Sequence, residues 1–271
     1  MKAGMTKALA VLPLIAALAA CGGGGGGGGD SGPATPAGLQ GTGDTSRPKV
    51  KAAFVKGQTA RYLMISSSSQ NAGRLETIEQ QTTGEVITMN GNALSGIDRA
   101  IADIAGDVSF AIGRWTHGSA VIGSSTKTLG ATGTAVHYAV YNAPDALPTS
   151  GSFSCDAGQF TVPTLDVAPG TEVGQAKGSA SLSFDASGAQ LDASITVTLA
   201  DGSAGTESAT GRKLSSPTTI TYTGGMLGGS SGLQLTMAQG LDASKQAVIV
   251  GYVVKVGASK YRGVAIFNCS K

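Results

Sequence analysis

The sequence is poor in charged and in aromatic side chains. Charged residues make up 13% of the 271 positions, against roughly 25% in ordinary soluble proteins, and aromatic residues make up 5%. The net charge of only +2 at pH 7 excludes a strongly basic nucleic-acid binder and also an acidic solvating chain. Hydrophobic residues still reach 41%, so the chain has enough apolar surface for a core.

Histidine and cysteine are scarce as well, with two and three copies. No Cys-x-x-Cys pair and no cysteine–histidine cluster is present, so we expect no zinc site and no cofactor. Residues 228–232 match the Gly-x-Ser-x-Gly pattern of hydrolases, but they lie in a glycine- and serine-rich turn. Both histidines precede that serine, which is the wrong order for an α/β-hydrolase, so we expect a protein that is not an enzyme.

The N-terminus has the pattern of an export signal. Lys2 and Lys7 precede a short apolar run, residues 8–18, which is too short to span a bilayer as a helix. The run ends in Leu-Ala-Ala-Cys, which resembles the lipobox of bacterial lipoproteins and implies that residues 1–20 are removed and Cys21 is lipidated. An ordinary secretory signal with a chance cysteine is the alternative. Glycine rather than aspartate follows Cys21, and the resemblance then implies the outer membrane.

Cleavage would leave a neutral protein on a flexible tether. Removal of residues 1–20 takes away two of the 19 basic residues and leaves 17 against 17 acidic ones, so we expect no nucleic-acid partner. Residues 21–47 comprise Cys21, eight consecutive glycines and a polar stretch dotted with proline. Such a segment buries too little apolar area to fold, and we expect a tether that joins the body to its lipid anchor.

The two other cysteines, Cys155 and Cys269, are predicted to form a disulfide. An exported protein folds in an oxidising compartment, where a pair of cysteines usually becomes oxidised. The alternative is two free, buried thiols. The bond would fasten the end of the chain, because Cys269 lies two residues from the C-terminus.

Residues 48–107 are predicted to be a small mixed region. Three short strands are expected at residues 59–65, 74–80 and 85–89. Apolar residues then recur at spacings of three and four from Leu94 to Val108, with Ser95 placed to cap a helix. The spacing predicts one short helix over residues 96–105.

Residues 108–271 are predicted to be a β-barrel. Apolar and polar residues alternate along 179–185 and 191–199, on both sides of a turn at Gly188, which is typical of a hairpin with one buried face. Similar short runs continue to the C-terminus. The fold class is therefore all-β dominated: an antiparallel up-and-down barrel of about eight strands, preceded by the small mixed region. The outward faces are rich in serine and aspartate, unlike those of a membrane-spanning barrel.

The barrel region resembles the transferrin-binding protein B type of surface lipoprotein, over about 155 of the 271 residues. The motifs that carry the resemblance are Gly113-Arg114-Trp115, Gly-Thr-Ala-Val-His-Tyr at 133–138, Leu-Pro-Thr-Ser-Gly-Ser-Phe at 147–153 and Gly-Ser-Ala-Ser-Leu-Ser-Phe-Asp at 178–185. The lipobox and the glycine tether also resemble these proteins. Members often carry a smaller handle region before the barrel, which is the role implied for residues 48–107.

The resemblance implies a monomeric, non-enzymatic lipoprotein that binds a macromolecular partner, such as a host iron- or haem-carrying protein. The alternatives are a structural envelope lipoprotein without a ligand and a barrel that binds haem or another small molecule. We expect recognition by long loops at residues 123–132, 159–175 and 200–216.

Three side chains are the candidates for direct ligand contact: His137, Tyr141 and Trp115. A histidine and a tyrosine on one strand could contact haem or a metal. The alternative is that Val136, Tyr138 and Val140 face the core while His137 and Tyr141 face water, and that Trp115 fills one end of the barrel.

Overall fold

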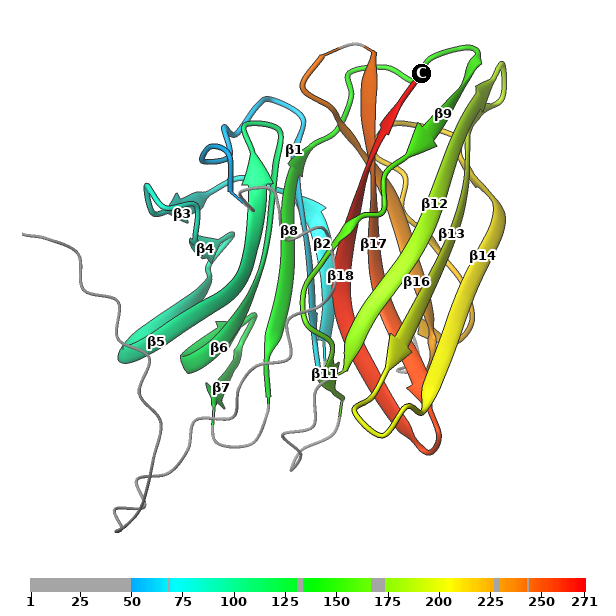
Figure 1. Ribbon diagram of the computed structural model, residues 1–271. Coiled ribbons are helices and arrows are strands. Elements are labelled where there is room, and N and C mark those ends of the chain that lie inside the picture. Colours follow the sequence, from blue (N-terminus) through cyan, green and yellow to red (C-terminus); the bar gives the residue numbers. More distant parts are fainter. Residues whose placement is uncertain (1–49, 68, 131–133, 167–173, 227–229, 243) are drawn as a thin grey trace, which may run out of the picture. The chain divides into compact units, whose positions relative to one another are not determined.

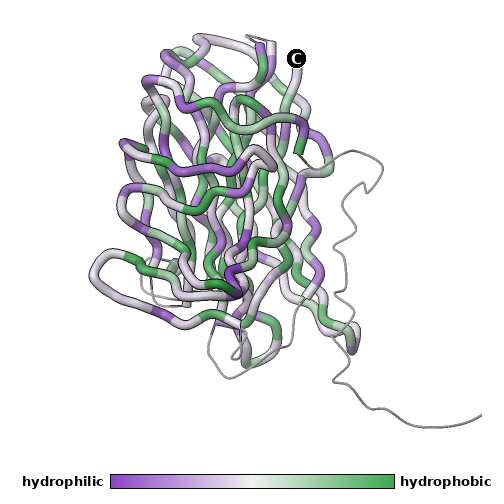
Figure 2. Tube along the Cα trace, turned by 90° about the vertical axis from the view of Figure 1, so that its left-hand side faces the viewer, coloured by the Kyte–Doolittle hydropathy of each residue, from purple (hydrophilic) through white to green (hydrophobic). Residues whose placement is uncertain are grey.

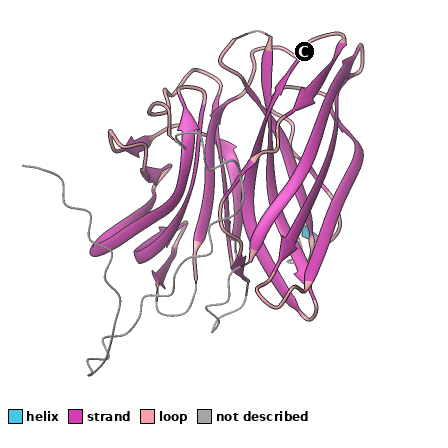
Figure 3. Ribbon diagram, in the orientation of Figure 1, coloured by secondary structure: helices cyan, strands magenta, loops and turns pink. Residues whose placement is uncertain are grey.

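The computed structural model describes residues 50–271 apart from residues 68, 131–133, 167–173, 227–229 and 243. They belong to one compact unit. The described residues form strands almost throughout, with a single 3₁₀ position at Met226 (Figure 3). The all-β expectation is confirmed, and no helix among these residues is long and apolar enough to cross a membrane. The predicted signal peptide, the predicted tether and Cys21 lie outside the described residues.

The first half of the described chain forms an antiparallel sheet of eight strands (Figure 1). Its order is β2-β1-β8-β6-β5-β4-β3, and β7 pairs with β6. The strands are β1 (Ala60–Ser66), β2 (Ser69–Arg74), β3 (Ile78–Gln80), β4 (Val86–Met89), β5 (Asn92–Asp107), β6 (Phe110–Ile122), β7 (Ser125–Leu129) and β8 (Val136–Asn142).

The second half forms an antiparallel sheet of ten strands with the order β14-β13-β12-β9-β18-β17-β16-β15, and β10 and β11 also pair with β18. The strands are β9 (Gly151–Cys155), β10 (Gln159–Phe160), β11 (Thr164–Leu165), β12 (Gln175–Asp185), β13 (Gly188–Thr198), β14 (Ala204–Leu214), β15 (Thr221–Tyr222), β16 (Gly232–Gln239), β17 (Lys245–Val256) and β18 (Ser259–Ser270).

The chain changes sheet between Asn142 and Gly151. Strands β6, β7 and β8 were expected in the barrel region that starts at residue 108, but they pair with β1 and β5 instead. The reason is that β8 lies between β1 and β6, so the N-terminal strands need it to complete their own sheet.

The second sheet curls into a nearly closed barrel, whose main path has the expected eight strands. Its two edge strands meet through one side chain: Arg212 of β14 donates from Nη2 to the backbone oxygen of Tyr222 at 2.7 Å and to Thr221 Oγ1 at 3.2 Å. At the other end of β14, a Cβ at Gly205 would lie 1.9 Å from the backbone oxygen of Lys255. Glycine therefore permits the close approach of β14 to β17.

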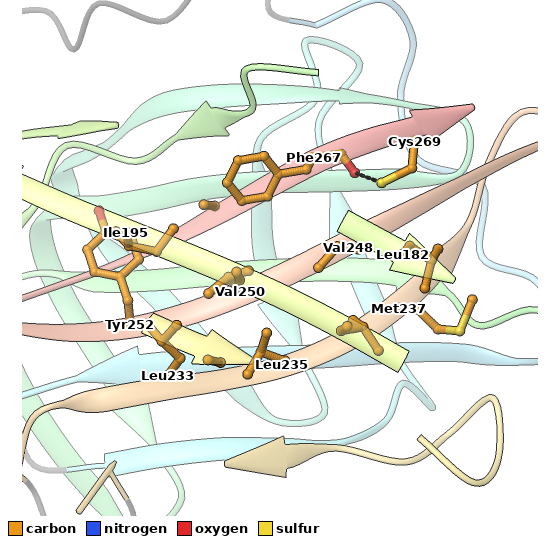
Figure 4. Packing of buried hydrophobic residues seen from close by; sticks show 14 of the residues in the cluster. Leu182, Ile195, Leu233, Leu235, Met237, Val248, Val250, Tyr252, Phe267 and Cys269 are labelled. Atoms are coloured by element: carbon orange, nitrogen blue, oxygen red, sulfur yellow. Dashed lines mark hydrogen bonds between the residues drawn. The ribbon is translucent and has the colours of Figure 1, made fainter. Parts of the chain in front are cut away.

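Alternation of side chains explains why these segments are strands. In β12 and β13, Leu182, Leu191 and Ile195 point into the barrel while serine, threonine and aspartate point outward. Hydropathy alternates along the strands in the same way (Figure 2). The inward side chains of β12, β13, β16, β17 and β18 fill the barrel (Figure 4).

Two further apolar clusters complete the core. One lies on the face of the first sheet that contains Trp115 and Tyr138. The other joins the two sheets, with Leu63, Ile65 and Ile112 from the first and Ile249, Val264 and Ile266 from the second. Because clusters cover both of its faces, β8 is buried from Val136 to Tyr141.

The predicted helix over residues 96–105 is wrong: this segment is part of strand β5. The register of β5 with β6 shifts at three places: between Ser95 and Ala100, between Ala100 and Ile101, and between Ala102 and Ala105. Each irregularity adds residues to one of the two strands and changes the face that the next side chain occupies. A period of two with three shifts therefore imitated a helical spacing, and Ile97, expected on the buried stripe, is fully exposed.

All three expected loops contain strands. Residues 200–216 are mostly β14, and residues 123–132 contain β7. The third, residues 159–175, contains β10 and β11, and residues 167–173 lie outside the described residues. Strand β14 was missed because its inward positions include Gly205 and Ala209, which give a weak hydrophobic alternation.

Four hairpins close with the same Asp-x-Ser turn. In each, Oδ1 of the aspartate accepts hydrogen bonds from the backbone N–H and the hydroxyl of the serine two residues later. The pairs are Asp107 and Ser109, Asp185 and Ser187, Asp201 and Ser203, and Asp242 and Ser244. These hydrogen bonds lower the pKa of the three aspartates in the second sheet.

Candidate functional site

The structure separates the three candidate ligand residues. Trp115 lies on one face of the first sheet, and His137 and Tyr141 lie on the other. Trp115 is fully buried, and its Nε1 donates to the backbone oxygen of Val86 at 2.8 Å. Its ring centroid lies 6.1 Å from that of Tyr138. Trp115 is therefore a core residue of the first sheet, beneath β4, rather than a plug at the end of the barrel.

His137 and Tyr141 lie between the two sheets. The expectation that they face water is wrong, since both are 0% exposed. The outward face of β8 packs against the second sheet, which the sequence of β8 alone does not reveal. The centre of this interface is apolar, and a cluster of polar side chains lies at each end of it. One cluster surrounds His137 and the other surrounds Tyr141.

Both ring nitrogens of His137 are hydrogen bonded to threonines of the second sheet. Nδ1 lies 2.8 Å from Thr161 Oγ1, and Nε2 lies 2.7 Å from Thr164 Oγ1. Thr161 Oγ1 also donates to the backbone oxygen of Val264 at 3.2 Å and accepts from its N–H at 2.9 Å. This pattern fits a neutral ring with its proton on Nδ1 and with Nε2 accepting from Thr164. Burial, followed by nearby Arg114 and Arg262, holds the pKa of His137 well below its ordinary value.

Two ion pairs flank His137. Asp103 of β5 accepts through Oδ2 from Arg114 Nε at 2.7 Å and from the backbone N–H of Val162 at 2.8 Å. Asp103 has a φ of 56° and lies in the irregular part of β5 between Ala102 and Ala105. The other pair joins Arg262 to Asp166, with both side chains at most 6% exposed. Burial lowers the pKa of Arg262 to about 10.

Tyr141 is the centre of the second polar group. Its hydroxyl lies near Thr236 of β16, Arg61 of β1 and Tyr222 of β15. Burial raises the pKa of Tyr141, and the hydroxyl of Thr236 and the charge of Arg61 act in the opposite direction. Thr236 in turn donates to the backbone oxygen of Thr219 at 3.1 Å. This group therefore joins β8 to the segment that leads into β15.

The predicted disulfide between Cys155 and Cys269 is confirmed. The two cysteines are directly opposed in the pairing of β9 with β18, and the bond spans 114 positions of the sequence. It fastens the last strand of the chain to the first strand of the second sheet.

Sequence reasoning missed Asp103, Asp166, Thr161 and Thr164. Asp103 fell in the predicted helix and the other three in a predicted loop. The charged residue between apolar neighbours in both segments was the available signal, but its partners lie far away in sequence. No group of three metal-ligating side chains occurs among the residues that the structure describes.

Comparisons with known proteins give no relative. No family model, no curated protein and no solved structure matches this chain.

Proposed function

We propose that this chain is a lipid-anchored outer-membrane lipoprotein whose barrel binds a macromolecular partner without catalysis. The support is the lipobox at Cys21, the glycine tether and the alternation of the barrel strands. The resemblance noted above makes a host iron- or haem-carrying protein the partner class to test first.

The filling of the barrel is the observation that favours a surface interaction. Side chains from β12, β13, β16, β17 and β18 converge inside it, including Leu182, Ile195, Val250 and Tyr252 (Figure 4). A small barrel filled by its own side chains recognises partners on its outside. A haem bound at His137 would have to displace a threonine from one ring nitrogen and enter a fully buried site, so the haem-binding alternative has less support.

One end of the barrel has the features of a recognition surface, which we call the rim. It comprises residues 143–150, the β12–β13 turn and the β16–β17 turn. Strand pairing brings these segments to the same end, because Gly151 pairs with Phe184 and Ser270 pairs with Lys245 (Figure 1). Leu241 in the β16–β17 turn is 51% exposed, and no other large apolar side chain among the described residues of the second sheet is exposed.

Binding of purified serum transferrin and haemoglobin to the full chain tests this proposal. We expect one of them to bind, and Leu241→Ser to weaken the binding, because Leu241 is the one large apolar side chain exposed among the described residues of the rim. Ile97→Ser is the matched control, since Ile97 is exposed on the first sheet, and it should retain binding. Failure of both proteins to bind contradicts the proposed partner class. Binding that survives Leu241→Ser undiminished contradicts the assignment of the rim as the recognition surface.

The anchor needs its own experiment, because it is independent of the partner. Cells that express the chain are fed a palmitate analogue, and the labelled protein is compared with a Cys21→Ser variant. We expect label on the wild type alone. Equal label on both proteins would contradict lipidation at Cys21.

A further inference from the structure

The segment of residues 159–166, which we call the strap, lies between β18 and the first sheet. It pairs with β18 through β10 and β11, with Thr164 opposite Arg262. Its hydrogen bonds to the first sheet are of a different kind. The hydroxyls of Thr161 and Thr164 contact His137 on β8, and the N–H of Val162 donates to Asp103 on β5. Among the described residues, one neutral imidazole therefore makes two of the three hydrogen bonds that hold the strap against the first sheet.

The charges around His137 are arranged so that a second ring proton is unfavourable. Arg114 on β6 and Arg262 on β18 lie on either side, each paired with one carboxylate, Asp103 or Asp166. Two further cations, Lys260 of β18 and Lys127 of β7, lie near Asp166 and Arg262 respectively. The Tyr252 hydroxyl of β17 donates to the backbone oxygen of Thr161 at 3.1 Å, and burial keeps it protonated. An imidazolium here would add a buried charge beside two guanidinium groups.

We propose that His137 is an acid-sensitive latch: its protonation releases the strap from β8 and loosens that end of the contact between the two sheets. The proposal does not depend on the identity or existence of a binding partner. It makes the strap the part of the barrel that responds to the acidity of the surroundings.

The direction of the effect follows from linkage. In the closed state the pKa of His137 lies well below 6.5, whereas a ring exposed by opening regains about 6.5. Between these two values the open state binds the proton and the closed state does not. The ratio of open to closed molecules then rises by up to about tenfold for each pH unit below 6.5.

Hydrogen exchange of the strap amides in the full chain measures this opening. The amide to follow is that of Val162, which donates to Asp103 of the first sheet. After correction for intrinsic rates, its exchange should speed up by about tenfold or more between about pH 7.5 and about pH 5. The amides of Thr161 and Asp166 donate to Val264 and Lys260 of β18, so they should stay protected if the strap leaves the first sheet alone. Amides of β13, which has no contact with His137, should keep their protection.

Two matched variants identify the group responsible. His137→Gln keeps a hydrogen-bonding side chain that cannot become charged, so the acid response of the strap should vanish. His117→Gln changes the one other histidine, which is exposed on β6, and should leave the response intact. An undiminished response in His137→Gln would overturn the proposal.

Imidazole NMR of the wild type covers the case in which His137→Gln does not fold. The chain has two histidines, so each ring can be assigned and its protonation followed with pH. Strap exchange should rise together with protonation of His137. A strap that stays protected after His137 has become charged would refute the latch.

Discussion

The ring of Tyr138 on β8 lies over Gly113, its directly opposed neighbour on β6. A Cβ at position 113 would lie 2.2 Å from the Tyr138 hydroxyl oxygen, so only glycine leaves room for the ring. The second sheet repeats the arrangement, with Tyr252 of β17 over Gly263 of β18 and the same distance of 2.2 Å. In both sheets, therefore, the ring of a tyrosine occupies the space that a side chain on the opposed glycine would need.

We expect Gly113→Ala to destabilise the protein by about 1–3 kcal/mol, because the new methyl group must displace a fully buried ring. Denaturant unfolding measures the loss. Gly73→Ala is the control: it also changes a strand glycine, but its Cβ would make only an ordinary contact, 3.5 Å from the Tyr62 ring. Equal losses at the two positions would show that backbone propensity, rather than the shared space, sets the cost.

The ion pair between Asp103 and Arg114 should contribute more to the free energy of unfolding than an exposed ion pair does. Both side chains are 14% exposed, and Asp103→Asn would leave a mostly buried guanidinium without its charge partner. We expect a loss of about 3 kcal/mol, while asparagine still tolerates the positive φ at this position. Glu76→Gln removes the partner of Arg74 in a pair whose side chains are 63–65% exposed, and it should cost less than about 1 kcal/mol. Denaturant unfolding measures both losses. Equal losses of unfolding free energy in Asp103→Asn and Glu76→Gln would contradict the expectation that the buried pair contributes more.

The buried tyrosines should make the free energy of unfolding fall at alkaline pH. Burial raises the pKa of Tyr138, Tyr141 and Tyr252 above the ordinary value of 10.0. Their contribution to stability is therefore complete below pH 10.0 and is lost as the pH rises above it toward the folded-state values, because the unfolded chain ionises first. Unfolding measured on both sides of pH 10.0 should show this loss, and Tyr252→Phe should reduce its slope. A slope unchanged in that variant would exclude Tyr252 as a source.

The disulfide should stabilise the barrel by restricting the unfolded chain. For the Cys155→Ala and Cys269→Ala double variant we expect a loss of about 2–5 kcal/mol, because the bond closes a loop of more than 100 residues. Non-reducing mass spectrometry of the exported protein first checks that the bond is present. Two free thiols in the native protein would contradict the bridge.

Local patterns in the sequence were sufficient to predict the class of the fold and the most regular elements. The alternation in β12 and β13 survives because each strand has one buried and one wet face, so its period of two is visible directly. The pairing of Cys155 with Cys269 was predictable as well, since they are the two cysteines that remain once Cys21 is assigned to the predicted lipid anchor.

Only the tertiary structure decided those features that depend on long-range contacts or on irregular backbone. Strand β5 looked like a helix because three register shifts against β6 change its side-chain pattern, and such a shift depends on the partner strand. Strand β8 looked half exposed because histidine and tyrosine suit water as well as a satisfied interior. Only the packing of one sheet on the other buries His137 and Tyr141, since the threonines and carboxylates that make this burial favourable come from segments with no recognisable pattern.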